Sequence, residues 1–302
     1  MNRKALRIDF VGDVLTRPFV GIKGLLSDFD VTLQHYDIDQ HIQVLLSETT
    51  PDVLICHARI EHFLVDDDFE QAAEQMQAYC AALSRFVAAG STLIIVNTLL
   101  VPINRVVGVA HIARARIVAQ MNAMLFDCVD QHALISIADI ASIMTAIGFE
   151  RGYNQQNDMV MRMPYTHHAI KPIITEYGRC IRERFAARKK VVLVDADNTL
   201  WGGIVGEDGV DGIVIDESFP GVVYRKFQMQ LRALRSSGIL IGLLTKNNEA
   251  DVQEAFSKHD MPLKWSGFSV IRANWQPKSE NIAAIAQELN VGVDSLVFID
   301  DN

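Results

Sequence analysis

The chain has 302 residues, of which 49% are apolar and 22% are charged. This length exceeds that of one ordinary core and is typical of two α/β domains, and the composition excludes an intrinsically disordered chain. The net charge of −9 argues against a nucleic acid or an anionic membrane as a partner held by bulk electrostatics. An anionic substrate stays open, because a lysine and a bound Mg²⁺ can reverse the field of one pocket.

Cysteine usage and hydropathy indicate the compartment. The four cysteines are widely spaced, without a C-x-x-C pair or a Cys/His cluster, so they indicate neither a disulfide framework nor a zinc site. The N-terminus lacks the apolar stretch of a signal peptide, and no apolar run is long enough to cross a bilayer. We therefore expect a cytoplasmic protein without a membrane partner.

Strand-like and helix-like segments alternate through the first half of the chain. Apolar residues recur at helical spacing over Asp67–Ala89, and Gly90 follows as a stop signal. This alternation predicts a doubly wound parallel sheet, with helices on both faces, in a domain of residues 1–165. The expected strands are Leu6–Val11, Asp52–His57, Ser91–Val96 and Ala133–Ala138.

Residues 166–189 are typical of a helix that enters a basic turn, and we interpret them as a linker helix. The α/β alternation then restarts, and predicts a second doubly wound parallel sheet in residues 190–302. The expected strands there are Lys189–Asp195, Ile239–Thr245 and Ser295–Asp301, and the expected helices are Phe219–Gly238, Asn248–His259 and Pro277–Asn290.

Several residues that could take part in catalysis or ligand binding lie where the predicted strands of the second domain end. Ligands of open parallel sheets bind at the carboxyl ends of the strands, so we expect these side chains to lie close together. They are Asp195 and Asp197 after the first strand, Thr245 and Asn247 at and after the second, Lys278 at a helix start, and Asp300 and Asp301 at the end of the last strand.

Such a set suits the transfer of a phosphoryl group. Crowded carboxylates need a cation, and Mg²⁺ prefers oxygen ligands. One aspartate can attack phosphorus and a second can move protons, while a hydroxyl and an amine hold the transferring oxygens. Singly, each residue has a plainer explanation, since aspartates at strand ends are often caps or turn residues. The order and placement of all four elements together favour a phosphoryl-transfer site.

The four elements resemble the four motifs of the haloacid dehalogenase (HAD) superfamily: "DADNT" from Asp195, Thr245, Lys278, and the Asp300–Asp301 pair. The segments "DADNTLWGGIVGEDG", "TKNNEADVQEAF", "NWQPKSENIAAIAQELNVG" and "VFIDDN" resemble the FkbH-like group of that superfamily. Members of this group take a glyceryl unit from 1,3-bisphosphoglycerate, remove phosphate and load the unit onto an acyl carrier protein. The resemblance implies a HAD-like Rossmannoid fold, and polyketide or related biosynthesis as the pathway.

The resemblance also implies residue roles. Asp195 is expected to be the nucleophile and a Mg²⁺ ligand, and Asp197 the acid/base, with its main-chain carbonyl facing the metal. Thr245 and Lys278 are expected to hold the phosphate, and Asp301 with Asp300 to complete the metal site. The remaining candidates, for substrate binding, are Thr199, Trp201, Gly202 and Asn247; for Trp201, which begins a flap, packing is an equal alternative.

The sequence departs from the family pattern in two places. The position before the motif-two hydroxyl, where the family carries an acyl-bearing cysteine, is Leu244. A leucine cannot carry an acyl group. A complete domain of this type is expected to continue past Asn302 by another strand and helix.

The first domain weakly resembles the SGNH hydrolases, a flavodoxin-like fold that FkbH-like proteins often carry. The block "FVGDVL" places Val14 where the nucleophilic serine stands, and Asn97 fits a later block. Because valine cannot attack an ester, we expect a non-catalytic scaffold that offers a docking surface for a carrier protein. His167 and His168 are expected to be structural.

Three functions therefore remain open. The first is an enzyme of phosphoryl chemistry that loads a carrier protein. The second is a phosphatase of a small phosphorylated metabolite without a carrier, which Leu244 favours. The third is a non-catalytic module that binds a carrier protein, against which the intact set of carboxylates argues.

Overall fold

The computed structural model describes residues 3–64, 68–101 and 109–301, which form two compact units, Met1–Ala186 and Ala187–Asn302. Both units are α/β, and every strand pair in both sheets is parallel. The prediction of two parallel-sheet domains is thus confirmed. Asp67, the predicted start of a helix, and Asn302 lie outside the described residues.

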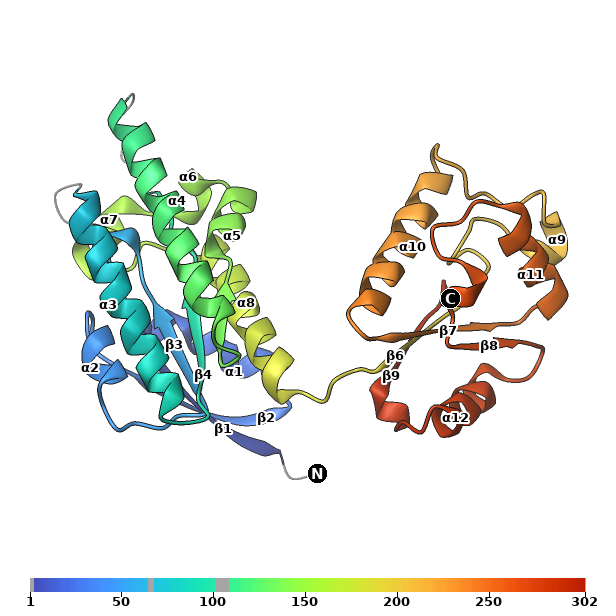
Figure 1. Cartoon of the computed structure of the whole chain (residues 1–302), viewed down its shortest axis with the longest axis horizontal. Helices are drawn as coiled ribbons and strands as arrows, with labels where there is room; N and C mark the ends of the chain where they lie inside the picture. The colour runs from blue at the N-terminus through green and yellow to red at the C-terminus, as the bar shows by residue number, and fades with distance from the viewer. Residues whose placement is uncertain (1–2, 65–67, 102–108, 302) are drawn as a thin grey trace. The chain divides into compact units, whose positions relative to one another are not determined.

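The first unit contains a five-stranded sheet of order β2-β1-β3-β4-β5 (Figure 1). This is one of the two common strand orders of doubly wound sheets. The order in which strands are added changes side between β1 and β3, while all strands stay parallel. The strands are β1 Lys4–Gly12, β2 Phe29–His35, β3 Val53–His57, β4 Leu93–Asn97 and β5 Ile135–Ala138. The helices are α1 Ile22–Leu25, α2 His41–Leu45, α3 Phe69–Ala88, α4 Val109–Asp130, α5 Ile140–Ile147, α6 Phe149–Gly152, α7 Gln155–Met161 and α8 His167–Phe185.

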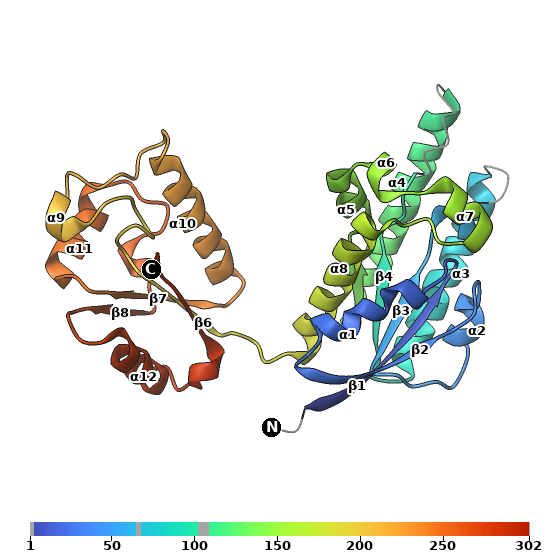
Figure 2. The same cartoon turned by 180° about the vertical axis from the view of Figure 1, so that it is seen from behind.

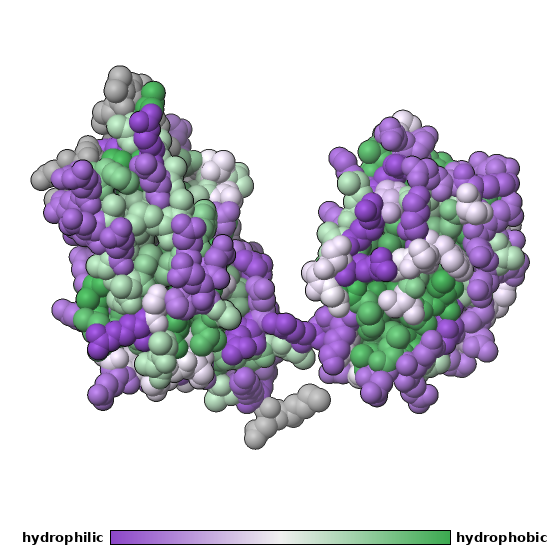
Figure 3. Space-filling view, in the orientation of Figure 1, coloured by the Kyte–Doolittle hydropathy of each residue, from purple (hydrophilic) through white to green (hydrophobic). Residues whose placement is uncertain are grey.

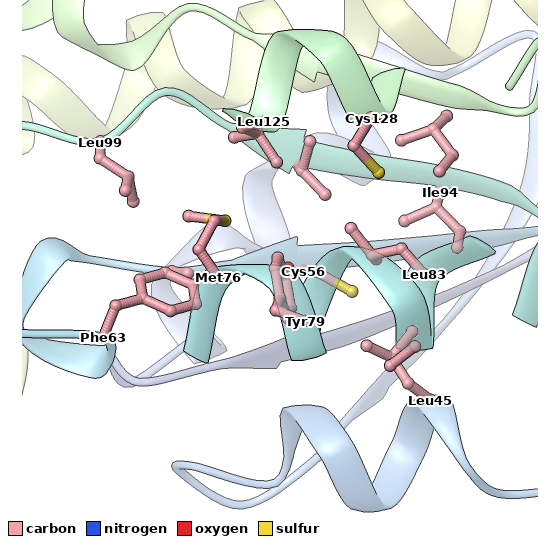
Figure 4. Close-up of a cluster of buried hydrophobic side chains, with 14 of the residues drawn as sticks. Leu45, Cys56, Phe63, Met76, Tyr79, Leu83, Ile94, Leu99, Leu125 and Cys128 are labelled. Atoms are coloured by element: carbon pink, nitrogen blue, oxygen red, sulfur yellow. The ribbon is translucent and has the colours of Figure 1, made fainter. Parts of the chain in front are cut away.

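Alternate residues of these strands feed two apolar clusters, one on each face of the sheet. One cluster lies under α3 and α4, where Cys56, Ile94, Met76, Leu83 and Leu125 interdigitate (Figure 4). The other lies under α1, α5 and α8, which Figure 2 shows on the opposite face. Because both faces are covered, β3 and β4 are buried along their whole length and show as continuous apolar runs.

The predicted linker helix is instead part of the first unit. Ala169, Ile173, Tyr177 and Ile181 of α8 recur at helical spacing and are buried among the strands and α5. The stripe of apolar residues requires a partner surface, which the sheet supplies. The boundary between the units therefore falls after Ala186, and not near residue 165.

The second unit contains a four-stranded sheet of order β8-β7-β6-β9. Counted from β6, this order is 3-2-1-4, as in the first strands of a Rossmann sheet. The order in which strands are added changes side between β6 and β9. The strands are β6 Val191–Val194, β7 Leu240–Thr245, β8 Val270–Ala273 and β9 Leu296–Ile299, and the helices are α9 Val205–Asp208, α10 Gly221–Ser236, α11 Glu249–Lys258 and α12 Lys278–Glu288.

Helices cover both faces of this second sheet as well. Val192, Val194 and Leu243 pack with residues of α10 and α11 on one face. Val191, Leu193 and Leu244 pack against α12 on the other, and the two helix groups flank the strands in Figure 1. In the face of Figure 3, hydrophobic residues gather over β6, β7 and β9.

The strands predicted in the sequence are confirmed in both units, while β2 and β8 are additional. Among the described residues, no helix has the length and apolar character that a bilayer crossing requires.

Candidate functional site

The carboxyl ends of β6, β7 and β9 place the predicted polar residues at one edge of the second sheet. Val194 pairs with Leu243 of β7 on one side and with Ile299 of β9 on the other. Asp195 and Asp300 therefore leave adjacent strands at the point where the strand order reverses. Open parallel sheets bind ligands at such a point.

Lys278, the first residue of α12, connects the two aspartates. Its Nζ lies 2.9 Å from Oδ2 of Asp195 and 2.7 Å from Oδ2 of Asp300. It also lies 5.2 Å from the centre of the Phe298 ring. Burial lowers the pKa of Lys278, but the bonds to the two carboxylates outweigh this effect and raise it. The amine is thus held as a cation between two carboxylates.

The two carboxylates respond differently to this shared cation. Burial raises the pKa of Asp195, and the hydrogen bonds from Lys278 and Thr245 only reduce this rise. For the more accessible Asp300, burial also acts upward, but the bond from Lys278 outweighs it and the pKa is lowered. Burial therefore disfavours the anionic form of Asp195 more than that of Asp300.

Three carboxylates form a group that could hold a metal ion. One oxygen from each of Asp195, Asp300 and Asp301 lies within 4.8 Å of the others. The buried Oδ1 of Asp300 has no hydrogen-bond partner among the described residues. A buried oxygen of this kind otherwise costs free energy, so a cation at this place satisfies it. An all-oxygen ligand set fits a hard divalent cation.

The side chain of Asp197 lies outside this group and is held by three N–H donors. Its Oδ1 accepts from Trp201 Nε1 and from the main-chain N–H of Val205, both at 3.1 Å. Its Oδ2 accepts from Asn247 Nδ2 at 2.8 Å. The same Asn247 amide nitrogen lies 3.1 Å from Oγ1 of Thr245, so Asn247 joins two of the predicted catalytic residues.

The four predicted substrate-binding residues lie in different surroundings. Trp201 is fully buried and packs edge-on against Phe256, which differs from the predicted substrate contact and agrees with the packing alternative. Gly202 pairs with Val214 through two main-chain hydrogen bonds. The buried Oγ1 of Thr199 has no partner among the described residues.

Close packing explains the glycine at position 202. A Cβ built there meets the Tyr224 ring at 3.0 Å, so a side chain would require the Tyr224 ring, or the flap that begins at Trp201, to shift by a few tenths of an ångström. The flap in turn delivers the Val205 N–H to Asp197.

Leu244 is fully buried in the cluster between the sheet and α12. Its neighbour Thr245, one residue on in the strand, points to the other face and lies by Asn247. The leucine thus fills the core behind the site, as a residue next to a strand end is expected to do.

In the first unit, the predicted SGNH-type residues perform structural work. Val14 is buried in the apolar cluster. Asn97 exchanges hydrogen bonds with the main chain of Ala58 at 2.9 and 2.8 Å, which fastens the ends of β3 and β4 together. His167 and His168 lie against one another at the start of α8, with ring centres 3.8 Å apart and ring planes tilted by 39°.

Two contacts of the site were missed by sequence reasoning. The Asn247–Asp197 and Trp201–Asp197 hydrogen bonds link the predicted acid/base to two residues that were assigned only to substrate binding. An asparagine two positions after Thr245 is a signal for the first, because it shares a strand end with the catalytic candidates. No signal in the sequence indicated that the indole N–H of Trp201 turns inward.

Comparison with known proteins gives an extensive structural likeness. No protein-family model and no curated protein matches the chain. The N-terminal part of the protein BF1531 from Bacteroides fragilis, described as containing a phosphatase domain and complexed with Mg, aligns with 99% of this chain and 85% of its own length, at 24% identity and a TM-score of 0.85. The salicylyl-acyltransferase SsfX3 from a tetracycline biosynthetic pathway aligns with 61% of this chain and 55% of its own, at 12% identity and a TM-score of 0.38. The first likeness shows the two-unit α/β fold of the chain.

Proposed function

We propose that the chain is a Mg²⁺-dependent phosphoryl-transfer enzyme of the HAD type, with Asp195 as its nucleophile. The observation that carries this proposal is the meeting of Asp195, Asp197, Thr245, Lys278 and the Asp300–Asp301 pair at one sheet edge. The Mg²⁺ described for the similar BF1531 structure adds support.

The cluster of three carboxylates fits Mg²⁺, which would be held by Asp195, Asp300 and Asp301. When bound, this ion neutralises the carboxylates and the phosphate oxygens, so that one anion can approach another. Lys278 contributes a fixed positive charge on the same side, and Thr245 a hydroxyl. Both suit the oxygens of a transferring phosphoryl group.

The proposed reaction has two steps. In the first, a carboxylate oxygen of Asp195 bonds to phosphorus and the bond from phosphorus to the leaving oxygen breaks. That oxygen takes a proton from Asp197. In the second, water attacks phosphorus and returns a proton to Asp197, which releases inorganic phosphate and restores Asp195.

We propose further that the substrate is 1,3-bisphosphoglycerate or a similar small phosphorylated metabolite. Asp195 then takes the phosphoryl group from the C3 oxygen, and the thiol of an acyl carrier protein attacks the C1 carbonyl, so that a thioester forms while the bond from C1 to the acyl-phosphate oxygen breaks and phosphate leaves. The FkbH-like segments around the four motifs support this proposal. A second candidate, hydrolysis without carrier loading, is favoured by Leu244, because the buried leucine offers no thiol for an acyl relay.

Two assays test these proposals. Phosphate release from p-nitrophenyl phosphate should require Mg²⁺, and full activity in excess chelator would contradict the metal assignment. Incubation with 1,3-bisphosphoglycerate, Mg²⁺ and a phosphopantetheinylated carrier, followed by intact mass, then separates the candidates. A glyceryl adduct on the carrier supports loading, whereas phosphate release with an unmodified carrier supports the simple phosphatase.

A further inference from the structure

The Asp197 carboxyl is unusually well fixed for a residue that the proposed function requires to move protons. Donors approach it from three separate segments: Trp201 in the turn after β6, Val205 in the flap, and Asn247 after β7. Two of these donors are side chains, so their contributions can be removed one at a time.

The two oxygens of Asp197 are not equivalent. Oδ1 accepts two N–H groups, from Trp201 and Val205, which uses both of its lone pairs. Oδ2 accepts from Asn247 and keeps a second lone pair. The carboxyl therefore has one oxygen that is locked in place and one that remains available to a proton.

Close packing surrounds Trp201 at this contact. Its side chain is fully buried, and its ring packs edge-on against Phe256 at 5.6 Å between ring centres. Asn247 is also buried, with 4% of its surface exposed, and its nitrogen is shared between Asp197 and Thr245. Both donors thus belong to the buried interior of the unit.

We propose that Trp201 and Asn247 are positioning residues, which orient the Asp197 carboxyl so that Oδ2 is the oxygen that gives a proton to the leaving group and receives one from water. This inference rests on the proposed phosphoryl-transfer function. It assigns to Trp201 and Asn247 a role through Asp197, in place of direct contact with the substrate. Fixing a catalytic group in one orientation is a recognised source of rate.

The test compares two phosphate esters that have the same ring but different leaving groups. Nitrophenolate is a weak base and leaves without a proton, whereas phenolate depends on protonation by an acid. Trp201→Phe keeps an aromatic ring but removes the N–H. We expect it to reduce kcat/KM for phenyl phosphate by at least about 10-fold more than for p-nitrophenyl phosphate. Asn247→Ala should have the same selective effect, and covers the case in which Trp201→Phe does not fold.

The matched control is Trp265→Phe. Trp265 packs on the same Phe256, also at 5.6 Å, and stands apart from the donors to Asp197, so the ratio between the two esters should not change. In an Asp197→Ala background, Trp201→Phe should cause no further change in that ratio, because the group through which it acts is gone.

The outcomes are distinguishable. An equal loss on both esters, or a further change in the Asp197→Ala background, would overturn the positioning role and leave the proposed function intact. Failure of the wild-type protein to hydrolyse either ester in Mg²⁺ would overturn the proposed function itself. A selective loss that the control does not share supports the inference.

Discussion

Replacing Lys278 by methionine should destabilise the second unit, because it removes the cation that Asp195 and Asp300 share. The side chains are similar in length, so the change is mainly one of charge. At 2.9 and 2.7 Å, each contact supplies about 6 kcal/mol of Coulomb attraction at an effective dielectric constant of about 20. Desolvation offsets most of this attraction.

The net effect is smaller still because the site is partly open to water. Removing one partner of a fully buried pair costs about 3–5 kcal/mol. Here 23% of the Lys278 side chain and 18% of Asp300 are exposed, and solvent screens the charges. We therefore expect the free energy of unfolding to fall by about 1–3 kcal/mol in the absence of divalent cations.

The chain offers a convenient probe for this measurement. Its three tryptophans, Trp201, Trp265 and Trp275, all lie in the second unit, so urea unfolding followed by tryptophan fluorescence reports on that unit alone. Lys264→Met is the matched control, because the pair of Lys264 with Asp260 is exposed and its loss should have no measurable effect.

Added Mg²⁺ should restore part of the stability of Lys278→Met, since the three carboxylates regain a positive partner. Phosphate release should fall by about 10²–10³-fold, as for loss of one group that stabilises the transferring phosphoryl oxygens. If Lys278→Met unfolds like the wild type without divalent cations, the reasoning about the shared cation is refuted.

Three further predictions concern both units. Because Val14, the residue expected at the position of a nucleophilic serine, is buried and cannot attack an ester, the chain should not hydrolyse an activated acetyl ester; activity that a serine-directed phosphonate abolishes would show that the nucleophile is misplaced. Because Leu244 has no thiol, no glyceryl adduct should form on the protein, and peptide mapping to any cysteine would contradict this. Burial lowers the pKa of His41 and His57 to about 3, so the unfolded state binds more protons below about pH 6.5 and each histidine reduces stability as the pH falls. Burial raises the pKa of Asp13 to about 6, which has the opposite sign and cancels one histidine. Burial also lowers the pKa of His35 and His62, which adds to the decline, so between pH 6 and 4 the unfolding free energy of the first unit should fall by at least about 1.4 kcal/mol per pH unit; urea unfolding followed by circular dichroism that shows no decline would refute this.

The buried strands were predicted from their apolar runs, whereas the edge strand β2 has no such run. β3 and β4 are buried at every position and are apolar except for their last residues, His57 and Asn97. β2 alternates polar and apolar residues and is half exposed, which is the pattern of a half-buried strand and escapes a search for continuous apolar runs. The structure supplies the missing information through its pairing with β1.

Helix α8 shows a different limit. Its amphipathic pattern was visible, but a pattern does not say which surface the apolar stripe contacts. The basic residues at the end of α8 suggested a linker, while Tyr177 and Ile181 pack into the first unit. Which surface a helix packs against depends on the tertiary fold, and the local pattern of one sequence does not indicate it.

The sequence indicates some contacts of the site and not others. Strand-end placement brings Asp195 and Asp300 together, because parallel strands end at one edge, and Lys278 meets them from the start of α12, which follows β8. The contacts to Asp197 depend on how the flap folds back after Trp201 and on the path of the chain at Asn247, 50 residues away in sequence. Those contacts follow from packing in the second unit, which periodicity and motif spacing do not determine.

As the proposed nucleophile, Asp195 should become phosphorylated during turnover. Protein in excess over acetyl phosphate should be mixed with this donor and Mg²⁺, and the reaction quenched. Reduction with borohydride then converts an aspartyl phosphate to homoserine. Peptide mass spectrometry should then find homoserine at position 195 in the wild type and not in Asp195→Asn, a variant that should also lose activity by a factor of about a thousand or more. Homoserine at another aspartate, or rapid turnover by a folded Asp195→Asn protein, would contradict the account.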